Sequence, residues 1–197
     1  MNKEKELIDK LIDLAFAEDI GDGDHTTLSC IPATAMGKSK LLIKEAGVLA
    51  GIEVAKEIFN RFDPSMKVEV FINDGTEVKP GDVAMIVEGK VQSLLQTERL
   101  MLNVMQRMSG IATMTRKYAR QLEGTHTRVL DTRKTTPGMR ILEKMAVKIG
   151  GGVNHRIGLF DMILLKDNHV DFAGGIDKAI NRAKDYCKEK GKDLKIE

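Results

Sequence analysis

The sequence predicts a protein with both α-helices and β-strands, in which an α+β part is followed by a part of alternating strands and helices. Apolar residues recur at helical spacing over residues 3–18 and 92–121, whereas residues 66–72 alternate between apolar and polar side chains. After residue 128, short apolar runs alternate with helical patterns in the order βαβαβ. That order is typical of parallel strands joined by helices.

The first part contains helices and strands that do not alternate regularly. A helix over residues 3–18 leads into the acidic, glycine-containing run 18–24, which predicts a turn because the spacing of a calcium loop is incomplete. Ser109-Gly110 is predicted to break the later helical pattern into two helices. The remaining predicted elements are strands over residues 38–44, 66–72 and 83–87, helices over residues 51–62 and 92–108, and a helix that follows Ser109-Gly110 and runs through Gln121.

The second part is predicted to contain strands over residues 128–131, 162–165 and 194–196 and helices over residues 139–148 and 175–188. Two of these strands deliver cations just past their carboxyl ends, at Arg133-Lys134 and at Lys166. In parallel α/β sheets and barrels the active site lies at that edge. Three strands are too few to close a barrel, so we expect the chain to continue beyond Glu197.

Composition excludes several functional classes. The chain is 42% hydrophobic and 30% charged, which is ordinary for a globular protein. A net charge of +2, an aromatic content of 4% and the lack of a basic stripe disfavour a nucleic-acid-binding module. No apolar run approaches the roughly 20 residues of a membrane helix, and the start lacks the apolar stretch of a secretion signal. We therefore expect a cytoplasmic protein that binds neither nucleic acid nor membrane.

The two cysteines, Cys30 and Cys187, stand far apart in the sequence and show no CxxC spacing. This pattern favours reduced, buried or inert thiols over a disulfide framework or a zinc site. We expect no metal site built from protein side chains.

Four clusters of residues carry possible chemistry: Glu98-Arg99 in a helix, and the segments 131–138, 150–156 and 164–169. The last three combine cations with turn residues beside the end of an apolar strand or helix. Cations that converge in this way are typical of a pocket for a small polyanion.

A simpler interpretation also exists for each cluster. Solvated or ordinary polar roles suit Arg99, the Arg133-Lys134 pair, His155 and His169. The triple glycine 150–152 permits a tight turn, and it can also bring backbone amides to an anion. Lys166 directly follows the apolar run 163–165, so its side chain either extends out of the core edge or points into a cleft.

Together, the clusters resemble the quinolinate phosphoribosyltransferase family almost letter for letter. The longest match is LDTRKTTPGMRILEKMAVKIGGGVNHRIGLFDMILLKDNH over residues 130–169. The others are EDIGDGDHTT over residues 18–27, AGVLAGIEVA over residues 46–55, and TERLMLNVMQRMSGIATMT over residues 97–115. The resemblance therefore extends over nearly the whole chain, far beyond what a short glycine motif provides.

The resemblance implies a fold and an activity. It implies an N-terminal α/β sandwich domain over residues 1–108, and over residues 109–197 the first part of an incomplete parallel α/β barrel. The implied enzyme is a pentosyltransferase that joins quinolinate to phosphoribosyl pyrophosphate and releases CO2, giving nicotinate mononucleotide and pyrophosphate in NAD biosynthesis. Mg2+ is implied as an ion bound with phosphoribosyl pyrophosphate, and no organic cofactor is implied.

The resemblance also implies a set of site residues in a homodimer. By the family pattern, the substrate is surrounded by Arg133, His155, Arg156 and Lys166, with Lys134 on the phosphoribosyl pyrophosphate side and Arg99 supplied by the partner subunit. Lys134 and Lys166 are the implied catalytic residues. A pyridine with two carboxylates needs several cations, and guanidinium offers bidentate geometry that ammonium does not. Catalysis then consists of positioning and charge placement.

The sequence departs from the family pattern at two places. Of the Glu-x-Glu pair that serves the ribose and magnesium, only Glu197 is present, and it matches the first member; the later glycine-rich loops are absent. We therefore expect the 197-residue chain to lack part of the active site and to show no measurable turnover. His25 stands where a hydrophobic residue is expected, and its role is open.

Two other functions remain open at this point. A phosphoribosyltransferase-like homologue from a molybdenum locus shares the fold, although Arg133, His155, Arg156 and Lys166 together favour the quinolinate enzyme. A non-catalytic fragment that retains dimerisation or ligand binding is the second alternative. An assay with both substrates separates that fragment from an active enzyme.

Overall fold

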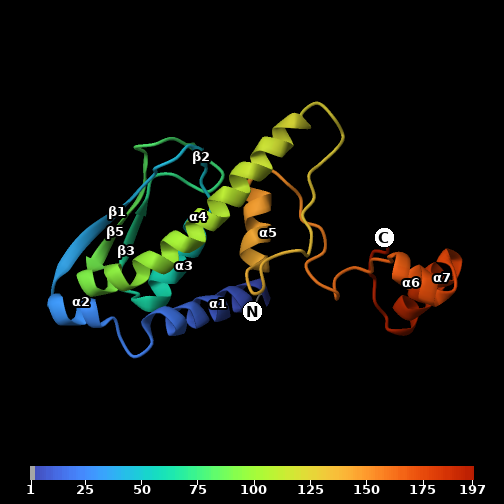
Figure 1. Cartoon of the computed structure of the whole chain (residues 1–197), viewed down its shortest axis with the longest axis horizontal. Helices are drawn as coiled ribbons and strands as arrows, with labels where there is room; N and C mark the ends of the chain where they lie inside the picture. The colour runs from blue at the N-terminus through green and yellow to red at the C-terminus, as the bar shows by residue number, and fades with distance from the viewer. Residues whose placement is uncertain (1–2) are drawn as a thin grey trace. The chain divides into compact units, whose positions relative to one another are not determined.

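The computed structural model describes residues 3–197, which form two compact units (Figure 1). Unit 1 contains the chain up to Asp131 together with Thr135–Asn154, and unit 2 contains Thr132–Lys134 and His155–Glu197. These units are defined by contacts, whereas the boundary predicted at residue 108 separates family domains. That boundary stays a prediction.

Unit 1 combines helices with two antiparallel sheets. In chain order its elements are α1 (Lys3–Ile20), α2 (His25–Cys30), β1 (Met36–Leu42), β2 (Gly47–Val48), α3 (Ile52–Phe62), β3 (Lys67–Val70), β4 (Glu77–Val78), β5 (Val83–Lys90), α4 (Val91–Gln121) and α5 (Arg140–Ile149). One sheet has the strand order β1-β5-β3, and the other pairs β2 with β4. The mixed α/β class and the non-alternating order predicted for this part are confirmed, although the two-residue strands β2 and β4 are too short to give an alternating pattern.

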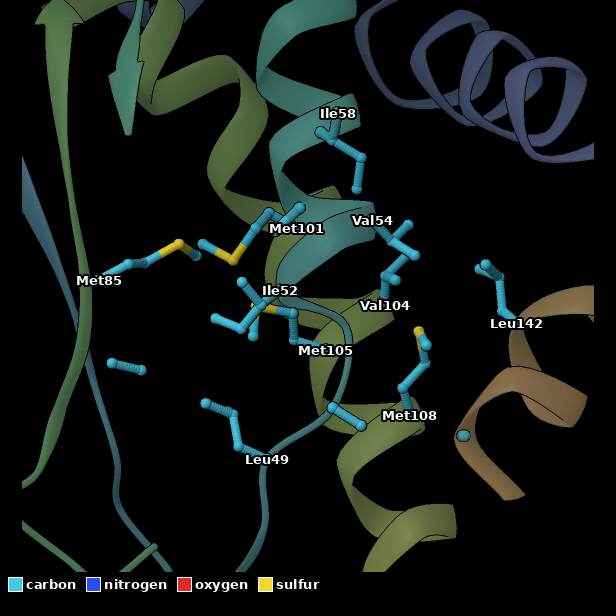
Figure 2. Close-up of a cluster of buried hydrophobic side chains, with 14 of the residues drawn as sticks. Leu49, Ile52, Val54, Ile58, Met85, Met101, Val104, Met105, Met108 and Leu142 are labelled. Atoms are coloured by element: carbon cyan, nitrogen blue, oxygen red, sulfur yellow. The ribbon is translucent and has the colours of Figure 1, made fainter. Parts of the chain in front are cut away.

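The core of unit 1 lies where α3 and α4 meet the three-stranded sheet and α5 (Figure 2). Ile58 of α3 and Met85 of β5 are fully buried, and Met108 of α4 is almost so. Leu142 of α5 belongs to the same cluster. Helix α5, the first helix predicted for the βα part, packs on α4 and contributes to this core. It therefore belongs to unit 1.

Helix α4 is continuous over its 31 residues, so the predicted break at Ser109-Gly110 is wrong (Figure 1). Ser109 Oγ accepts a hydrogen bond from the amide of Ala50 (3.0 Å) and also contacts the Ala50 carbonyl oxygen (3.2 Å). These tertiary contacts outweigh the low helix propensity of glycine, which costs about 1 kcal/mol relative to alanine.

Replacing Gly110 by alanine is expected to stabilise the protein by about 0.5–1 kcal/mol, because a Cβ at this exposed helical position meets no atom within 4 Å. Urea unfolding measures the change. Gly150→Ala is the matched control and should destabilise the protein, because its Cβ would lie 2.5 Å from the Ala112 carbonyl oxygen. A Gly110→Ala protein less stable than the original would mean that α4 is not a continuous helix.

The acidic run after α1 contains a helix start as well as the predicted turn. Helix α1 ends at Ile20, and Asp24 accepts a hydrogen bond from the amide of Thr27 (3.0 Å), which caps the N-terminus of α2. His25 is the first residue of α2; it is exposed, and its Nε2 lies 3.5 Å from Asp22 Oδ1. The sequence did not predict α2, because a helix of six residues is too short to show a periodic apolar pattern.

Unit 2 contains α6 (Asp167–Ala173), α7 (Ile176–Glu189) and a parallel bridge between Ile163 and Ile196. The predicted helix over residues 175–188 is confirmed. Residues 167–169, to which the sequence assigned no element, begin α6. The predicted strands 162–165 and 194–196 are parallel neighbours, as expected for a βαβ unit.

The first predicted strand of the βα part has a different partner. Leu130 forms a parallel bridge with Val153, and Val153 donates its N–H to the Val129 carbonyl (2.8 Å). The chain therefore forms an isolated parallel bridge directly after the triple glycine. A single bridge residue has no periodic pattern, so the sequence did not predict this bridge.

Neither cysteine forms a disulfide among residues 3–197. Cys30 is exposed and Cys187 is half-buried, so neither side chain belongs to the core. No helix within this range has the length and apolar character needed to cross a membrane.

Candidate functional site

Parallel strand ends place Lys166 and Glu197 at the same edge of unit 2. Ile163 donates its N–H to the Lys195 carbonyl (2.9 Å), and Leu165 donates to the Glu197 carbonyl (2.7 Å). Both predicted site residues thus stand at the carboxyl ends of neighbouring strands. This is the edge at which parallel α/β proteins build their sites.

His155 joins this edge through Glu197. Its Nε2 lies 2.9 Å from Glu197 Oε2, and the imidazole is mostly buried. The hydrogen bond from His155 holds the pKa of the Glu197 carboxyl below its ordinary value of 4.5, with smaller contributions from the charges of His155, Lys195 and Arg156. The contact brings together residues 42 positions apart in the sequence, both of which were predicted to belong to the site.

The His155–Glu197 contact predicts a pH dependence. Because the pKa of Glu197 is lowered in the folded state, its contribution to stability is present above the ordinary glutamate pKa and is lost as the pH falls through the lowered value. A carboxyl carbon NMR titration should give a midpoint below 4.5 for Glu197, and in His155→Ala the midpoint should rise towards 4.5. An unchanged midpoint in the variant would show that the contact does not persist in solution.

Arg156 is the buried cation of the set. Its side chain is 9% exposed, and Nη1 donates to the Met162 carbonyl (3.1 Å). The loop that follows is held by Asp161, whose carboxylate accepts the amides of Ile157 and Gly158, each at 2.8 Å. Arg156 is therefore fixed by the local backbone, which limits the entropy lost when an anion binds.

Arg133 and Lys134 belong to the short segment of unit 2 that follows Asp131. Arg133 is half-buried and Lys134 is exposed. The amide of Lys134 donates to Thr132 Oγ1 (3.0 Å), which shapes a tight turn at the two cations. The segment thus presents two positive charges from a constrained backbone.

Lys166 is exposed and immediately precedes α6. Its amide donates to His169 Nδ1 (3.0 Å), so His169 shapes the first turn of α6. The structure supports the polar interpretation of His169. Lys166 is open to solvent, and its role in the site stays a prediction.

Arg99 lies in unit 1, on an exposed part of α4, whereas the other predicted site residues belong to unit 2. Glu98 beside it lines a cavity of about 410 Å3 together with β1 and α4 residues. A second cavity of about 490 Å3 is lined by residues 41–49 and α4. Both linings are mainly aliphatic, so these cavities suit a dicarboxylate less well than the cation set of unit 2 does.

Four polar residues beside the predicted segments have no role in the predicted site: Asp131, Glu143, Lys144 and Asn154. The side chains of Asp131, Glu143 and Lys144 are buried, and Asn154 is half-buried. Lys144 Nζ donates to Asp131 Oδ1, and the exposed fractions of the two side chains are 3% and 7%. Asp131 and Asn154 lay within clusters chosen for their cations. The Glu143-Lys144 pair gave no signal, because such pairs are ordinary on helix surfaces.

No group of three or more His, Cys, Asp or Glu side chains within residues 3–197 is arranged to hold a metal ion. In unit 2, the Glu197 carboxylate is paired with His155.

These observations define a mixed α/β protein in which Lys166 and Glu197 end neighbouring parallel strands and His155 contacts Glu197. Arg133, Lys134 and Arg156 belong to the same unit. Two family models match the chain: the quinolinate phosphoribosyl transferase N-terminal domain over residues 24–109 and its C-terminal domain over residues 111–197.

Similar proteins lead to the same family. The chain is 47% identical over 189 residues to "Quinolinate phosphoribosyltransferase [decarboxylating] 1b" of Nicotiana tabacum, covering 95% of this chain and 53% of the relative. It is 45% identical to the chloroplastic nicotinate-nucleotide pyrophosphorylase [carboxylating] of Arabidopsis thaliana. That match covers 95% of this chain and 53% of the relative. The chain thus spans about half the length of these curated relatives.

Solved structures agree. The crystal structure of NadC from Streptococcus pyogenes matches with a TM-score of 0.87 and 42% identity, over 91% of this chain and 64% of that one. The nicotinate-nucleotide pyrophosphorylase of Francisella tularensis matches with a TM-score of 0.87 and 36% identity, over 97% and 67%. The chain belongs to the quinolinate phosphoribosyltransferase family, and its fold fits an α/β sandwich followed by part of an α/β barrel.

Proposed function

We propose that the chain takes part in phosphoribosyl transfer to quinolinate with decarboxylation, the activity that its relatives' names describe. The observation that carries this proposal is the cation set of unit 2, in which Arg156 is fixed by the backbone and His155 contacts Glu197. Two adjacent carboxylates on a pyridine match several cations better than a monocarboxylate does. The molybdenum-locus homologue has no comparable observation in its favour.

The proposed reaction exchanges one bond at the ribose and one bond at the ring. The pyridine nitrogen bonds to the anomeric carbon of phosphoribosyl pyrophosphate as pyrophosphate leaves. The resulting pyridinium accepts the electron pair of the carbon–carboxylate bond when CO2 departs, and the ring carbon then takes a proton, giving nicotinate mononucleotide. Arg133, Arg156 and Lys166 hold the dicarboxylate, while Lys134 and Lys166 place positive charge where the reacting groups develop charge. Mg2+ bound with phosphoribosyl pyrophosphate would neutralise the leaving pyrophosphate.

Titration calorimetry with quinolinate and nicotinate tests the proposal. Nicotinate is the matched control because it lacks one carboxylate. Quinolinate should bind at least about tenfold more tightly, the equivalent of roughly 1.4 kcal/mol. Equal affinities would contradict a site built for a dicarboxylate. A parallel turnover assay with phosphoribosyl pyrophosphate and Mg2+ separates catalysis from ligand binding alone.

We further propose that the site is completed in a homodimer, with Arg99 supplied by the partner subunit and the barrel as the setting of the other residues. The exposure of Arg99 on α4 and its place in unit 1 support this arrangement. The two free cysteines support a reducing compartment, for which we propose the cytoplasm. Cell fractionation tests that location, and recovery in an organelle fraction would contradict it.

Mixed dimers test the role of Arg99. Dimers of Arg99→Ala alone or Lys166→Ala alone should each lose quinolinate binding, whereas a mixed dimer should regain one site, seen as one quinolinate per dimer in calorimetry. The unmixed dimers serve as controls. If verified mixed dimers bind no quinolinate, the site is built within one chain.

A further inference from the structure

Helix α5 carries two adjacent charged residues in a buried position. Glu143 is 8% exposed and Lys144 is 2% exposed, while their neighbours Leu142 and Ala146 belong to the core. A buried charge is strongly unfavourable unless it is paired and hydrogen-bonded. The partners of these two side chains therefore show what the buried charges do.

Lys144 fastens the end of the strand that contains Leu130. Its Nζ donates to Asp131 Oδ1, and Asp131 Oδ2 accepts from Asn154 Nδ2 (2.8 Å) in the amide orientation that satisfies both groups. Asn154 Nδ2 also donates to the Lys144 carbonyl (2.8 Å). The Asp131 carboxylate is thus hydrogen-bonded to both Lys144 and Asn154. Asp131 and Asn154 directly follow the bridged residues Leu130 and Val153.

Glu143 binds Thr136, which follows the loop formed by residues 132–135. Its Oε1 accepts from Arg107 Nε (2.8 Å), and its Oε2 accepts from the amide of Thr136 (3.4 Å). Arg107 Nη2 also donates to Thr136 Oγ1 (2.5 Å). Arg107 comes from α4, so this side of the loop is attached to two helices.

We propose that Glu143 and Lys144 are positioning residues that fix the two ends of the loop carrying Arg133 and Lys134. The loop leaves unit 1 after Asp131 and returns by Thr136, and each of these residues is held by one of the two buried charges. Through Asn154 the same network holds the residue directly before His155. That the fixed loop serves a quinolinate site rests on the proposed function.

The short span explains why two anchors suffice. Four residues separate Asp131 from Thr136 in the sequence, so fixing both ends leaves the backbone at Arg133 few conformations. A guanidinium that is positioned in advance binds a carboxylate without an ordering penalty, and a misplacement of about 1 Å can lower a rate about a hundredfold. The Lys144–Asp131 pair is buried from solvent, whereas Arg107, the partner of Glu143, is 43% exposed and is screened more.

Hydrogen exchange followed by mass spectrometry tests the proposal without a ligand. In Lys144→Met the peptide over residues 130–139 should exchange at least about tenfold faster. The double variant Lys144→Met/Asp131→Leu removes both charges, which should restore stability while leaving the loop loose. Lys148→Met is the matched control: the same substitution, one turn along α5, at an exposed position.

The outcomes separate positioning from a purely structural role. The proposal is supported if residues 130–139 exchange faster in the double variant and quinolinate affinity falls about tenfold. The control Lys148→Met should change neither the exchange rates nor the affinity. Original exchange rates and affinity in the stable double variant would overturn it. If the unaltered chain binds no quinolinate, the proposed function fails, and the exchange rates still decide whether the two charges fix the loop.

Discussion

Arg133→Ala should weaken quinolinate binding by about 2–4 kcal/mol, roughly thirty- to a thousandfold, because it removes a charged bidentate contact from a half-buried position. The effect on phosphoribosyl pyrophosphate should be smaller, since Arg133 is assigned to the dicarboxylate. Titration calorimetry with each ligand measures the two changes.

The matched control is Arg182→Ala, which removes another arginine of unit 2. Arg182 is exposed and donates to the Ala173 carbonyl (3.2 Å), outside the predicted set. Its loss should leave quinolinate affinity within about twofold of the original, as expected for an exposed charge. Equal losses of both ligands in Arg133→Ala would show that the assignment of this residue to the dicarboxylate is wrong.

Lys144→Met should lower the free energy of unfolding by about 3–5 kcal/mol, the largest stability effect expected here. It leaves Asp131 buried without its cation, and the Lys144 side chain is only 3% exposed. Urea unfolding measures the loss. Adding Asp131→Leu should recover much of it, because two apolar residues need no pairing. A single variant as stable as the original would show that the charges are not buried in solution.

Much of the fold could be predicted from the sequence where periodicity is long. The helices α1, α3, α5 and α7 and the strands β1, β3 and β5 appear within a few residues of their predicted bounds. The helix α4 was predicted as two pieces because Ser109-Gly110 has low local helix propensity, which its tertiary contacts with Ala50 override. Short elements such as α2, α6 and the bridge at Val153 have too few residues to show a period.

The cations of the candidate site could be named from the sequence, whereas the contacts that hold the surrounding backbone could not. Past the strand ends, Arg133 and Lys166 stand out from sequence alone, because a charge directly after an apolar run requires an explanation. The pairing of His155 with Glu197 depends on strands that meet only after folding. The burial of Glu143 and Lys144 depends on how α5 packs, which no pattern within one helix reveals.

The measurement that tests the central claim most directly is an amide NMR titration of the chain with quinolinate. We expect the largest shift changes at residues 132–134, 155–156 and 166, the cation set of unit 2. Nicotinate at the same concentrations should give smaller changes there. Changes concentrated at residues 41–49 and along α4, which line the aliphatic cavity of unit 1, would contradict the assignment of the site.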